Sequence, residues 1–382
     1  MAVGHVFVLL LAVICCVGEC KKMNVLLIIA DDAGFETSVY NNTVVRTPHL
    51  AALGRRSLVF QNAFTSVSSC SPSRSAILTG LPQVCVCVCV CVCACVLNAI
   101  AHHMTHSEFC FLHFTYYTEQ KYKRIGLVLA ELREAGNEND TLVIYSSDNG
   151  IPFPNGRTNL YESGTAEPML VSSPEHRERW GGTSQAYVSL LDITPTILDW
   201  FSIPYPSYCL PGTPTTPVSL TGRSLLPVLV SEPSPAAWHT VYASQSLQEV
   251  TMYYPIRSIH QGAYRLLHNL HYRMPFPIDQ DFYVSPTFQD LLNNTLAGRP
   301  TGWFKTLQQY YYRDRWELFD LRSDPEETVN LAGDPALAPV LESLRDRLVK
   351  WQWDTGDPWV CGPDAVLEDK LEPHCRPLYN GL

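Results

Sequence analysis

The sequence predicts an α/β fold, with a large, mostly parallel central sheet flanked by helices and a smaller α+β region after it. Two apolar runs, 24–30 and 141–146, are continuous rather than alternating, which is typical of strands buried on both faces of a parallel sheet. Strand and helix patterns alternate along the first half of the chain, as α/β folds require. Beyond about Tyr254, short alternating strands precede one long helix.

The composition is that of a globular protein, with 46% hydrophobic and 17% charged residues among 382. This length suits one large domain or two. The net charge of −10 argues against general affinity for nucleic acid or anionic membranes. A local basic pocket could still bind an anionic substrate.

Residues 1–20 are mostly apolar and end in small residues before a pair of lysines, so we expect a cleaved secretory signal. A buried N-terminal strand is the alternative, but a second apolar strand follows at once. No other run is long enough to span a membrane. Sequons at Asn41, Asn139 and Asn293 fit a glycosylated lumenal protein.

The predicted elements follow in chain order. We expect one domain over 21–253 and a C-terminal α+β domain with an antiparallel sheet over 254–382. A glycine or a proline marks several of the predicted ends. They are a strand at 24–30, a helix from Thr47, a strand at 58–64, a helix from Cys70 to about Gly80, a helix at 125–136, strands at 141–146 and 169–172, a helix at 188–201 interrupted by Pro195, a Pro/Ser/Thr-rich connection at 203–235, strands within 255–267 and at 316–320, and a helix at 340–351.

Cys70 begins the run Cys-Ser-Pro-Ser-Arg at the start of a predicted helix. Free N–H groups and the helix dipole attract anions there. Arg74, one turn later, lies on the same face and offers a planar fork to an oxyanion. The alternative is a small buried cysteine before a helix started by proline.

Paired polar residues end two of the apolar strands: Asp31 and Asp32 follow the first, and Asp148 and Asn149 follow the second. The C-terminal ends of such strands form the ligand-binding edge of an α/β sheet. Oxygen ligands of this kind suit calcium or magnesium. A helix cap or turn is the alternative for a single Asp-Asp pair.

The run from Cys70 to Arg74 resembles the signature of the type I sulfatases. Within that family, longer runs are most similar to members that remove N-sulfate groups from heparan sulfate. The similarity covers about 23–83 and 125–382. The runs are 64–74, 147–161, 191–208, 274–285 and 350–361.

The resemblance implies an alkaline-phosphatase-like fold and a modified nucleophile. A formylglycine-generating enzyme would convert Cys70 to formylglycine in the endoplasmic reticulum. The hydrated aldehyde would attack sulfur, give a covalent sulfate and then expel it, which a plain serine or thiol could not do. One Ca²⁺ would neutralise the sulfate, and Arg74 and Arg157 would add fixed positive charge. The implied calcium ligands are Asp31, Asp32, Asp148, Asn149 and the side chain at position 70.

The implied substrate is N-sulfoglucosamine at the non-reducing end of heparan sulfate, hydrolysed in the lysosome after passage through the secretory pathway. The family also implies a homodimer. Asp279, Gln280 and Asp281, in an aromatic, proline-rich loop, are candidates to face the sugar, although turns favour the same residue types.

The cysteines include two near the C-terminus and a cluster in an anomalous stretch. Cys361 and Cys375 are expected to form a disulfide that closes a short loop in an oxidising compartment, whereas Cys209 has no evident partner. Residues 84–124 begin with nearly pure Val-Cys alternation, which suits no metal site and is what a translated GT repeat would encode. We expect this stretch to be an anomalous insert that replaces core elements.

The family's Lys- and His-bearing motifs, which bind sulfate and protonate the leaving group, belong in that stretch. His102, His103 and His106 match neither motif, so they receive no role. The chain as written is therefore expected to lack a complete active site. Two alternatives remain: another sulfatase or alkaline-phosphatase-superfamily phosphodiesterase or phosphonate hydrolase, and an inactive glycan-binding product of an aberrant transcript.

Overall fold

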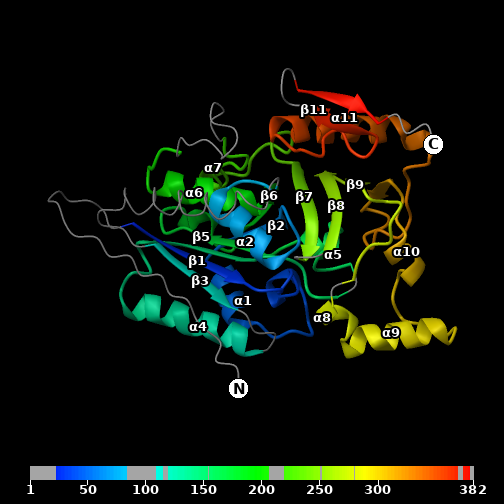
Figure 1. Cartoon of the computed structure of the whole chain (residues 1–382). Coiled ribbons are helices and arrows are strands. Elements are labelled where there is room, and N and C mark those ends of the chain that lie inside the picture. The colour runs from blue at the N-terminus through cyan, green and yellow to red at the C-terminus, as the bar shows by residue number, and fades with distance from the viewer. Residues whose placement is uncertain are drawn as a thin grey trace. The chain divides into compact units, whose positions relative to one another are not determined.

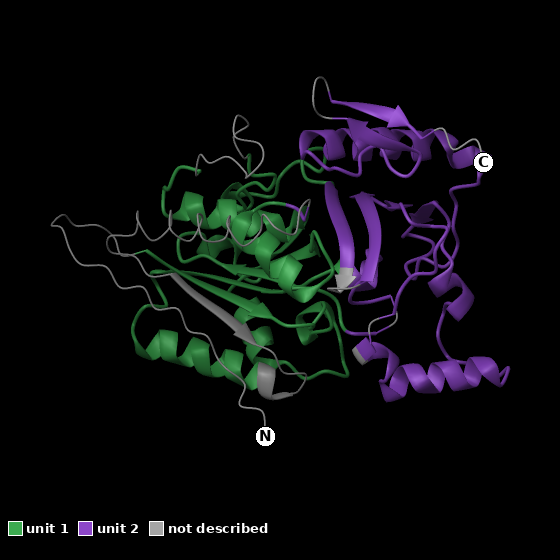
Figure 2. Ribbon diagram, viewed as in Figure 1, with its two compact units in different colours: residues 1–81, 85–151, 165–239 green, residues 82–84, 152–164, 240–382 purple. Residues whose placement is uncertain are grey.

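The chain divides into two compact units in the computed structural model (Figure 2). The first unit comprises residues 1–81, 85–151 and 165–239, and the second comprises 82–84, 152–164 and 240–382. The expected signal, Cys209 and the three histidines at 102, 103 and 106 lie outside the described residues. The structure describes residues 23–83, 109–114, 119–153, 155–205, 219–249, 252–278, 280–368 and 373–378.

A six-stranded sheet organises the first unit, in the order β3-β1-β4-β5-β2-β6 (Figure 1). β1 pairs in parallel with β3 and β4, and β2 with β6. β5 is antiparallel to both β4 and β2, so the other five strands share one direction. This confirms the predicted α/β class. The strands are β1 (Asn24–Ala30), β2 (Leu58–Phe64), β3 (Phe109–Phe114), β4 (Thr141–Ser147), β5 (Met169–Ser172) and β6 (Thr183–Ser189).

Helices cover both faces of this sheet (Figure 1). Along β1, Val25, Leu27 and Ile29 pack on the side of α2, α6 and α7, whereas Leu26 and Ile28 pack on the side of α1 and α4. A strand buried on both faces accounts for the continuous apolar run. The helical elements are η1 (Ser38–Tyr40), α1 (Pro48–Gly54), α2 (Cys70–Thr79), α4 (Glu119–Glu134), η2 (Arg177–Arg179), η3 (Leu190–Asp192), α6 (Ile193–Trp200) and α7 (Leu226–Val230).

Three sequence-based boundaries need correction. Residues 109–114 form β3 beside β1, and 119–124 begin α4, although both lie in the stretch set apart as an insert. The predicted helix at 188–201 starts later, because 183–189 form β6 and only 193–200 form α6. Pro195 lies in the first turn of α6 and does not interrupt it, since that turn has no intrahelical N–H bond to lose.

The second unit contains a four-stranded antiparallel sheet, β10-β9-β8-β7, and a two-stranded sheet, β11-β12. β7 hydrogen-bonds to β8, so the domain boundary predicted after residue 253 falls inside β8. The other predicted domain limits remain predictions. The elements are α5 (Glu162–Thr165), β7 (Thr240–Glu249), β8 (Met252–Gln261), β9 (Tyr264–Asn269), α8 (Gln280–Tyr283), α9 (Pro286–Leu296), α10 (Leu307–Tyr311), β10 (Trp316–Asp320), η4 (Pro335–Leu337), α11 (Ala338–Asp354), β11 (Ala365–Glu368) and β12 (His374–Pro377).

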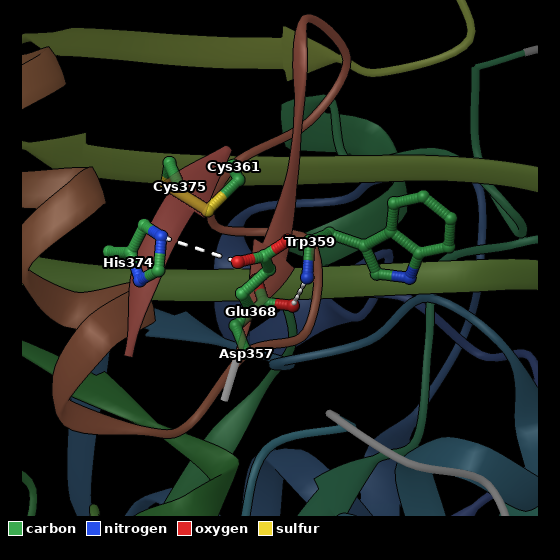
Figure 3. Close-up of a disulfide and its surroundings, with 6 residues drawn as sticks. All are labelled: Asp357, Trp359, Cys361, Glu368, His374 and Cys375. Carbon is green, nitrogen blue, oxygen red and sulfur yellow. Dashed lines mark hydrogen bonds and ion pairs between the residues drawn. A yellow bond between two sulfur atoms is a disulfide. The ribbon is translucent and has the colours of Figure 1, made fainter. Parts of the chain in front are cut away.

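A disulfide joins Cys361 to Cys375, the two cysteines paired in the sequence analysis, and closes a loop that contains β11 and ends in β12 (Figure 3). Beside it, His374 Nε2 lies 3.4 Å from Glu368 Oε2 across the two-stranded sheet. The backbone N–H of Trp359 donates to Asp357 Oδ1 over 3.0 Å. Covalent and polar links thus hold a tail that has little apolar core of its own.

Candidate functional site

Strand register places the ends of β1 and β4 side by side. Ala30 pairs with Ser147, so the loops that follow start at the same level on the C-terminal edge of the sheet. The backbone N–H of Asp32 donates to Asp148 Oδ1 over 3.0 Å. Asn149 Nδ2 donates to Asp32 Oδ1 over 2.6 Å. The structure therefore brings together the four polar residues that the sequence places at strand ends.

These side chains are removed from water. Asp32 is 4% exposed, and Asp148 and Asn149 are fully buried. Asp32 also adopts a left-handed backbone conformation with φ 49°. A non-glycine residue keeps such a conformation only where its surroundings fix it, which is common at ligand sites.

Cys70 is the first residue of α2, after Ser69 in an extended conformation. Its Sγ donates to Asp32 Oδ1 over 3.4 Å. One ligand atom from each of Asp31, Asp32 and Cys70 lies within 4.8 Å of the others. Ser73, one turn further, donates from Oγ to the backbone oxygen of Asp148 over 2.5 Å, which fastens α2 to the end of β4.

Arg74 joins two of the carboxylates. Its Nε donates to Asp148 Oδ2 over 2.8 Å, and its terminal nitrogen contacts Asp31 as well. Burial alone would lower the pKa of Arg74, but the carboxylates of Asp148 and Asp31 outweigh it and raise that pKa. Burial raises the pKa of Asp148, and the Arg74 guanidinium opposes that shift. Arg74 therefore carries a fixed positive charge in this site.

The donor set fits a hard cation. Asp31, Asp32 and Asp148 supply carboxylate oxygens, the ligands that calcium and magnesium prefer. Asn149 Oδ1 is buried and accepts no hydrogen bond from any residue that the structure describes. A buried carbonyl oxygen left without a donor is costly, and a coordinated cation would satisfy it.

The other predicted site residues belong to the second unit or its loops. Arg157 lines a small hollow with Phe153, Phe282 and Tyr310. Gln280 starts α8 and is exposed. Asp281 lies in the same helix, but its side chain is outside the described set, as is the whole of Asp279. Roles for these residues at the sugar or sulfate remain predictions.

The three sequon asparagines, Asn41, Asn139 and Asn293, are all exposed. Arg177 donates to Asn139 Oδ1 over 2.7 Å, which leaves the Nδ2 atom, where a glycan would be attached, directed away from that bond. The geometry is compatible with glycosylation at each position.

Sequence reasoning missed two buried residues beside the four ligand candidates. Ser147, the last residue of β4, and Glu167, just before β5, are 0% and 2% exposed. A signal existed for Glu167, because it is a charged residue next to the apolar run Met169–Val171, where burial of a carboxylate needs an explanation.

Two family models match the chain. The one described as Sulfatase matches residues 23–86 and 113–203, and the one described as N-sulphoglucosamine sulphohydrolase, C-terminal, matches residues 282–354. The match to the first model resumes at residue 113, before the 125 expected from sequence. The gap between its two parts contains most of the Val-Cys alternation, which begins at Val84.

A curated relative is similar over nearly its whole length. N-sulphoglucosamine sulphohydrolase of Homo sapiens is 47% identical over an alignment of 498 positions, which covers 97% of this chain and 98% of the relative. Because the alignment is longer than the 382 residues of the chain, the relative contains residues without a counterpart here.

Solved structures share the fold. A protein solved with its substrate D-glucosamine-2-N,6-O-disulfate superposes with a TM-score of 0.61 at 15% identity, covering 88% of this chain and 99% of that one. The phosphonate monoester hydrolase of Agrobacterium radiobacter gives 0.59 at 13% identity, covering 94% and 100%. At these identities the likeness concerns architecture, and it confirms the expected alkaline-phosphatase-like fold.

Proposed function

The chain belongs to the sulfatase family, and from this premise we propose that it hydrolyses the N-sulfate of N-sulfoglucosamine at the non-reducing end of heparan sulfate. The observation that carries this proposal is the similarity to the human relative of that name along nearly all of both chains. The reaction breaks the sulfur–nitrogen bond. The oxygen of water ends on sulfur as sulfate, and the amine of glucosamine takes up a proton.

We propose Ca²⁺ as the cation of this site, held by Asp31, Asp32, Asp148 and Asn149 with the side chain at position 70. When bound, it would neutralise charge on the sulfate oxygens as a Lewis acid. The buried, unsatisfied Oδ1 of Asn149 supports this assignment. The left-handed turn at Asp32 keeps that carboxylate beside Asn149.

Position 70 would carry formylglycine, made from Cys70 in the secretory pathway by a formylglycine-generating enzyme. The hydrated aldehyde would supply a hydroxyl nucleophile and a second hydroxyl that lets sulfate leave. The chain provides the surroundings for such a group. Cys70 lies at a helix N-terminus, which stabilises negative charge, and it lies 3.4 Å from a carboxylate oxygen that can accept its proton.

Arg74 would hold the sulfate in place while sulfur is attacked. Its two contacts to Asp148 and Asp31 fix the guanidinium, so little reorganisation is needed when charge develops on the sulfate. Arg157 is proposed as a second cation on the sulfate. Asp279, Gln280 and Asp281 are proposed to face the sugar.

The expected signal and sequons support a glycoprotein that reaches the lysosome through the secretory pathway, and a homodimer is proposed from the family resemblance. Among the described residues, none of the helices is long and apolar enough to cross a membrane. The proposed substrate is an oligosaccharide derived from heparan sulfate.

We further propose that a chain with this sequence lacks part of the active site. The Lys- and His-bearing motifs of the family have no counterpart between Gln83 and Ile125, and the human relative contains additional residues. Without an acid to protonate the leaving group, the nitrogen would depart unprotonated. General-acid catalysis typically speeds such a step about 10²–10⁴-fold, and the chain would lose that factor.

The test compares sulfate release by the printed chain and by a chain whose residues 84–124 are exchanged for the corresponding segment of the human relative. The exchanged chain should release sulfate from N-sulfoglucosamine, and its Cys70→Ala variant should not. Glucosamine 6-sulfate and a phosphonate monoester serve as competing substrates. Preference for either competitor, or no sulfate from N-sulfoglucosamine, would contradict the proposed function.

A further inference from the structure

The turn that carries Arg157 has a backbone conformation that few side chains tolerate. Asn155 and Thr158 have φ angles of 69° and 72°, which lie in the left-handed region. Thr158 is β-branched, so this conformation is a genuine outlier that persists only where the surroundings impose it. The turn therefore depends on partners outside itself.

Backbone contacts hold the turn from one side. The N–H of Asn159 donates to the backbone oxygen of Gly156 over 3.0 Å, and Ser163 Oγ donates to that of Asn155 over 2.8 Å. Gly164 of α5 packs so closely that a Cβ atom there would lie 2.2 Å from the backbone oxygen of Asn159 and 2.5 Å from that of Gly156. These contacts fix the backbone on either side of the arginine.

A buried amide and a buried guanidinium complete the arrangement. Arg313 is 4% exposed, and Asn159 is fully buried. Arg313 Nη2 donates to Asn159 Oδ1 over 2.6 Å, and Asn159 Nδ2 donates to the backbone oxygen of Arg157 over 3.3 Å. An arginine can only donate, so the amide oxygen must face Arg313, and the amide nitrogen is left for Arg157.

Arg313 also holds another part of the hollow that Arg157 lines. Its Nε donates to the backbone oxygen of Tyr310 over 3.1 Å, and both Tyr310 and Thr158 line that hollow beside Arg157. The guanidinium carbon lies 3.6 Å from the centre of the Phe276 ring, a cation–π contact that keeps the charged group in place within an aromatic environment. One buried cation thus joins the turn to α10.

We propose that Asn159 and Arg313 are positioning residues, which together fix the backbone of Arg157 so that its guanidinium is ready to bind a sulfate or sulfamate oxyanion. The inference rests on the proposed role of Arg157 at the substrate. It assigns neither Asn159 nor Arg313 a contact with the substrate. A side chain that is already held in place loses less conformational freedom on binding, so more of the interaction appears as affinity.

The test measures the dissociation constant of N-sulfoglucosamine by isothermal titration calorimetry on the full chain with calcium present. Asn159→Asp keeps the shape of the side chain and the oxygen that faces Arg313, and it removes only the N–H that Arg157 accepts. This variant should keep the wild-type midpoint of urea unfolding and still bind about 3–10-fold more weakly. Arg313→Lys, which keeps the charge but loses the planar fork, should weaken binding to a similar extent.

A double-mutant cycle separates positioning from a general effect on the fold or the charge. Arg157→Ala should weaken binding about 10–100-fold by removing a charge-assisted hydrogen bond. Adding Asn159→Asp to it should bring no further loss. Gln308→Glu, which places a new carboxylate at an exposed position of α10, controls for added charge and should leave the affinity unchanged.

Wild-type affinity in Asn159→Asp or in Arg313→Lys would overturn the inference and leave the proposed function intact. The same loss from Asn159→Asp with and without Arg157 would also overturn it, because the effect would then not pass through Arg157. Wild-type affinity in Arg157→Ala, or no binding of N-sulfoglucosamine by the wild-type chain, would instead overturn the proposed function of Arg157, and this inference with it.

Discussion

Asn149 donates from Nδ2 to Asp32 Oδ1 over 2.6 Å, although the two residues lie 117 positions apart in the chain. The parallel pairing of β1 with β4 creates this contact, because Ala30 lies opposite Ser147 and the next residues of both strands leave the sheet together. Asp32 thus accepts from the amide nitrogen of Asn149, whereas the Oδ1 atom of Asn149 accepts no hydrogen bond from the residues that the structure describes.

Calcium should stabilise the chain through this cluster. At a free concentration 100 times its dissociation constant, a bound ion adds about 2.7 kcal/mol to the free energy of unfolding. We expect thermal unfolding to shift upward with calcium in the wild type and not in Asp31→Asn. Asp346→Asn, changed at an exposed position of α11, should keep the shift. An unaltered calcium response in Asp31→Asn would show that the ion binds elsewhere.

The buried pair Arg257–Asp357 should dominate the polar contribution to stability in the second unit. Arg257 Nε lies 2.5 Å from Asp357 Oδ2, and both side chains are almost fully buried. Asp357→Asn leaves the guanidinium uncompensated, which costs about 3–5 kcal/mol. The exposed pair Lys350–Asp354 on α11 is the control, and Asp354→Asn should cost under about 1 kcal/mol.

Urea unfolding of these two variants measures the difference directly. The midpoint for Asp357→Asn should fall far below that for Asp354→Asn. Equal losses in the two variants would mean that water reaches Arg257 or that its other partners, such as the backbone oxygen of Gln245, already satisfy it.

His268 should make the chain less stable as the pH falls. Burial, and then the cations Arg315 and Arg257, lower the pKa of His268 to about 3, and its ring stacks on Trp316. Below the ordinary histidine pKa of about 6.5 the unfolded chain binds a proton that the folded chain refuses. His268 therefore lowers the free energy of unfolding as the pH falls from 6.5 toward 3, by up to about 1.4 kcal/mol per pH unit.

The comparison is the free energy of unfolding at pH 7 and pH 5. His268→Gln should lose about 2 kcal/mol less than the wild type between these values. His374→Gln, changed at an exposed histidine, should follow the wild type. Parallel pH dependences for wild type and His268→Gln would refute the assignment.

The sequence predicted the central sheet and the ligand candidates well because both follow from local pattern. Continuous apolar strands and the polar pairs after them are visible in the residue order of 24–32 and 141–149. Glu167 could not be placed in this way, because its surroundings come from β2 and β4, which are distant in the chain. The start of α6 was also missed, since alternation in 183–189 merges with the helical pattern.

The stretch at 84–124 could be predicted only in part. Because the whole stretch was expected to be an anomalous insert, the pairing of 109–114 with β1 was not predicted. That pairing covers an edge of β1 that would otherwise expose backbone groups.

A chain carrying the Val-Cys stretch should leave the endoplasmic reticulum poorly. Six closely spaced thiols in an oxidising lumen favour mispaired disulfides and aggregation. The secreted fraction, measured by pulse labelling, should rise when residues 84–124 are exchanged for the segment of the human relative. Sequencing the transcript from Gln83 to Ile125 should reveal the additional coding residues. Efficient secretion of the printed chain, with full activity, would contradict this account.

The most direct test of the account is the mass of the peptide that contains residue 70, taken from the full chain after passage through the secretory pathway of cells with an active formylglycine-generating enzyme. The account predicts an aldehyde at position 70, detected by its mass and by its reaction with a hydrazide. Because Pro72 and Arg74 belong to the proposed signature, the aldehyde should be absent in Pro72→Ala and in Arg74→Ala. An unmodified thiol at Cys70 in the wild-type chain would contradict the proposed nucleophile.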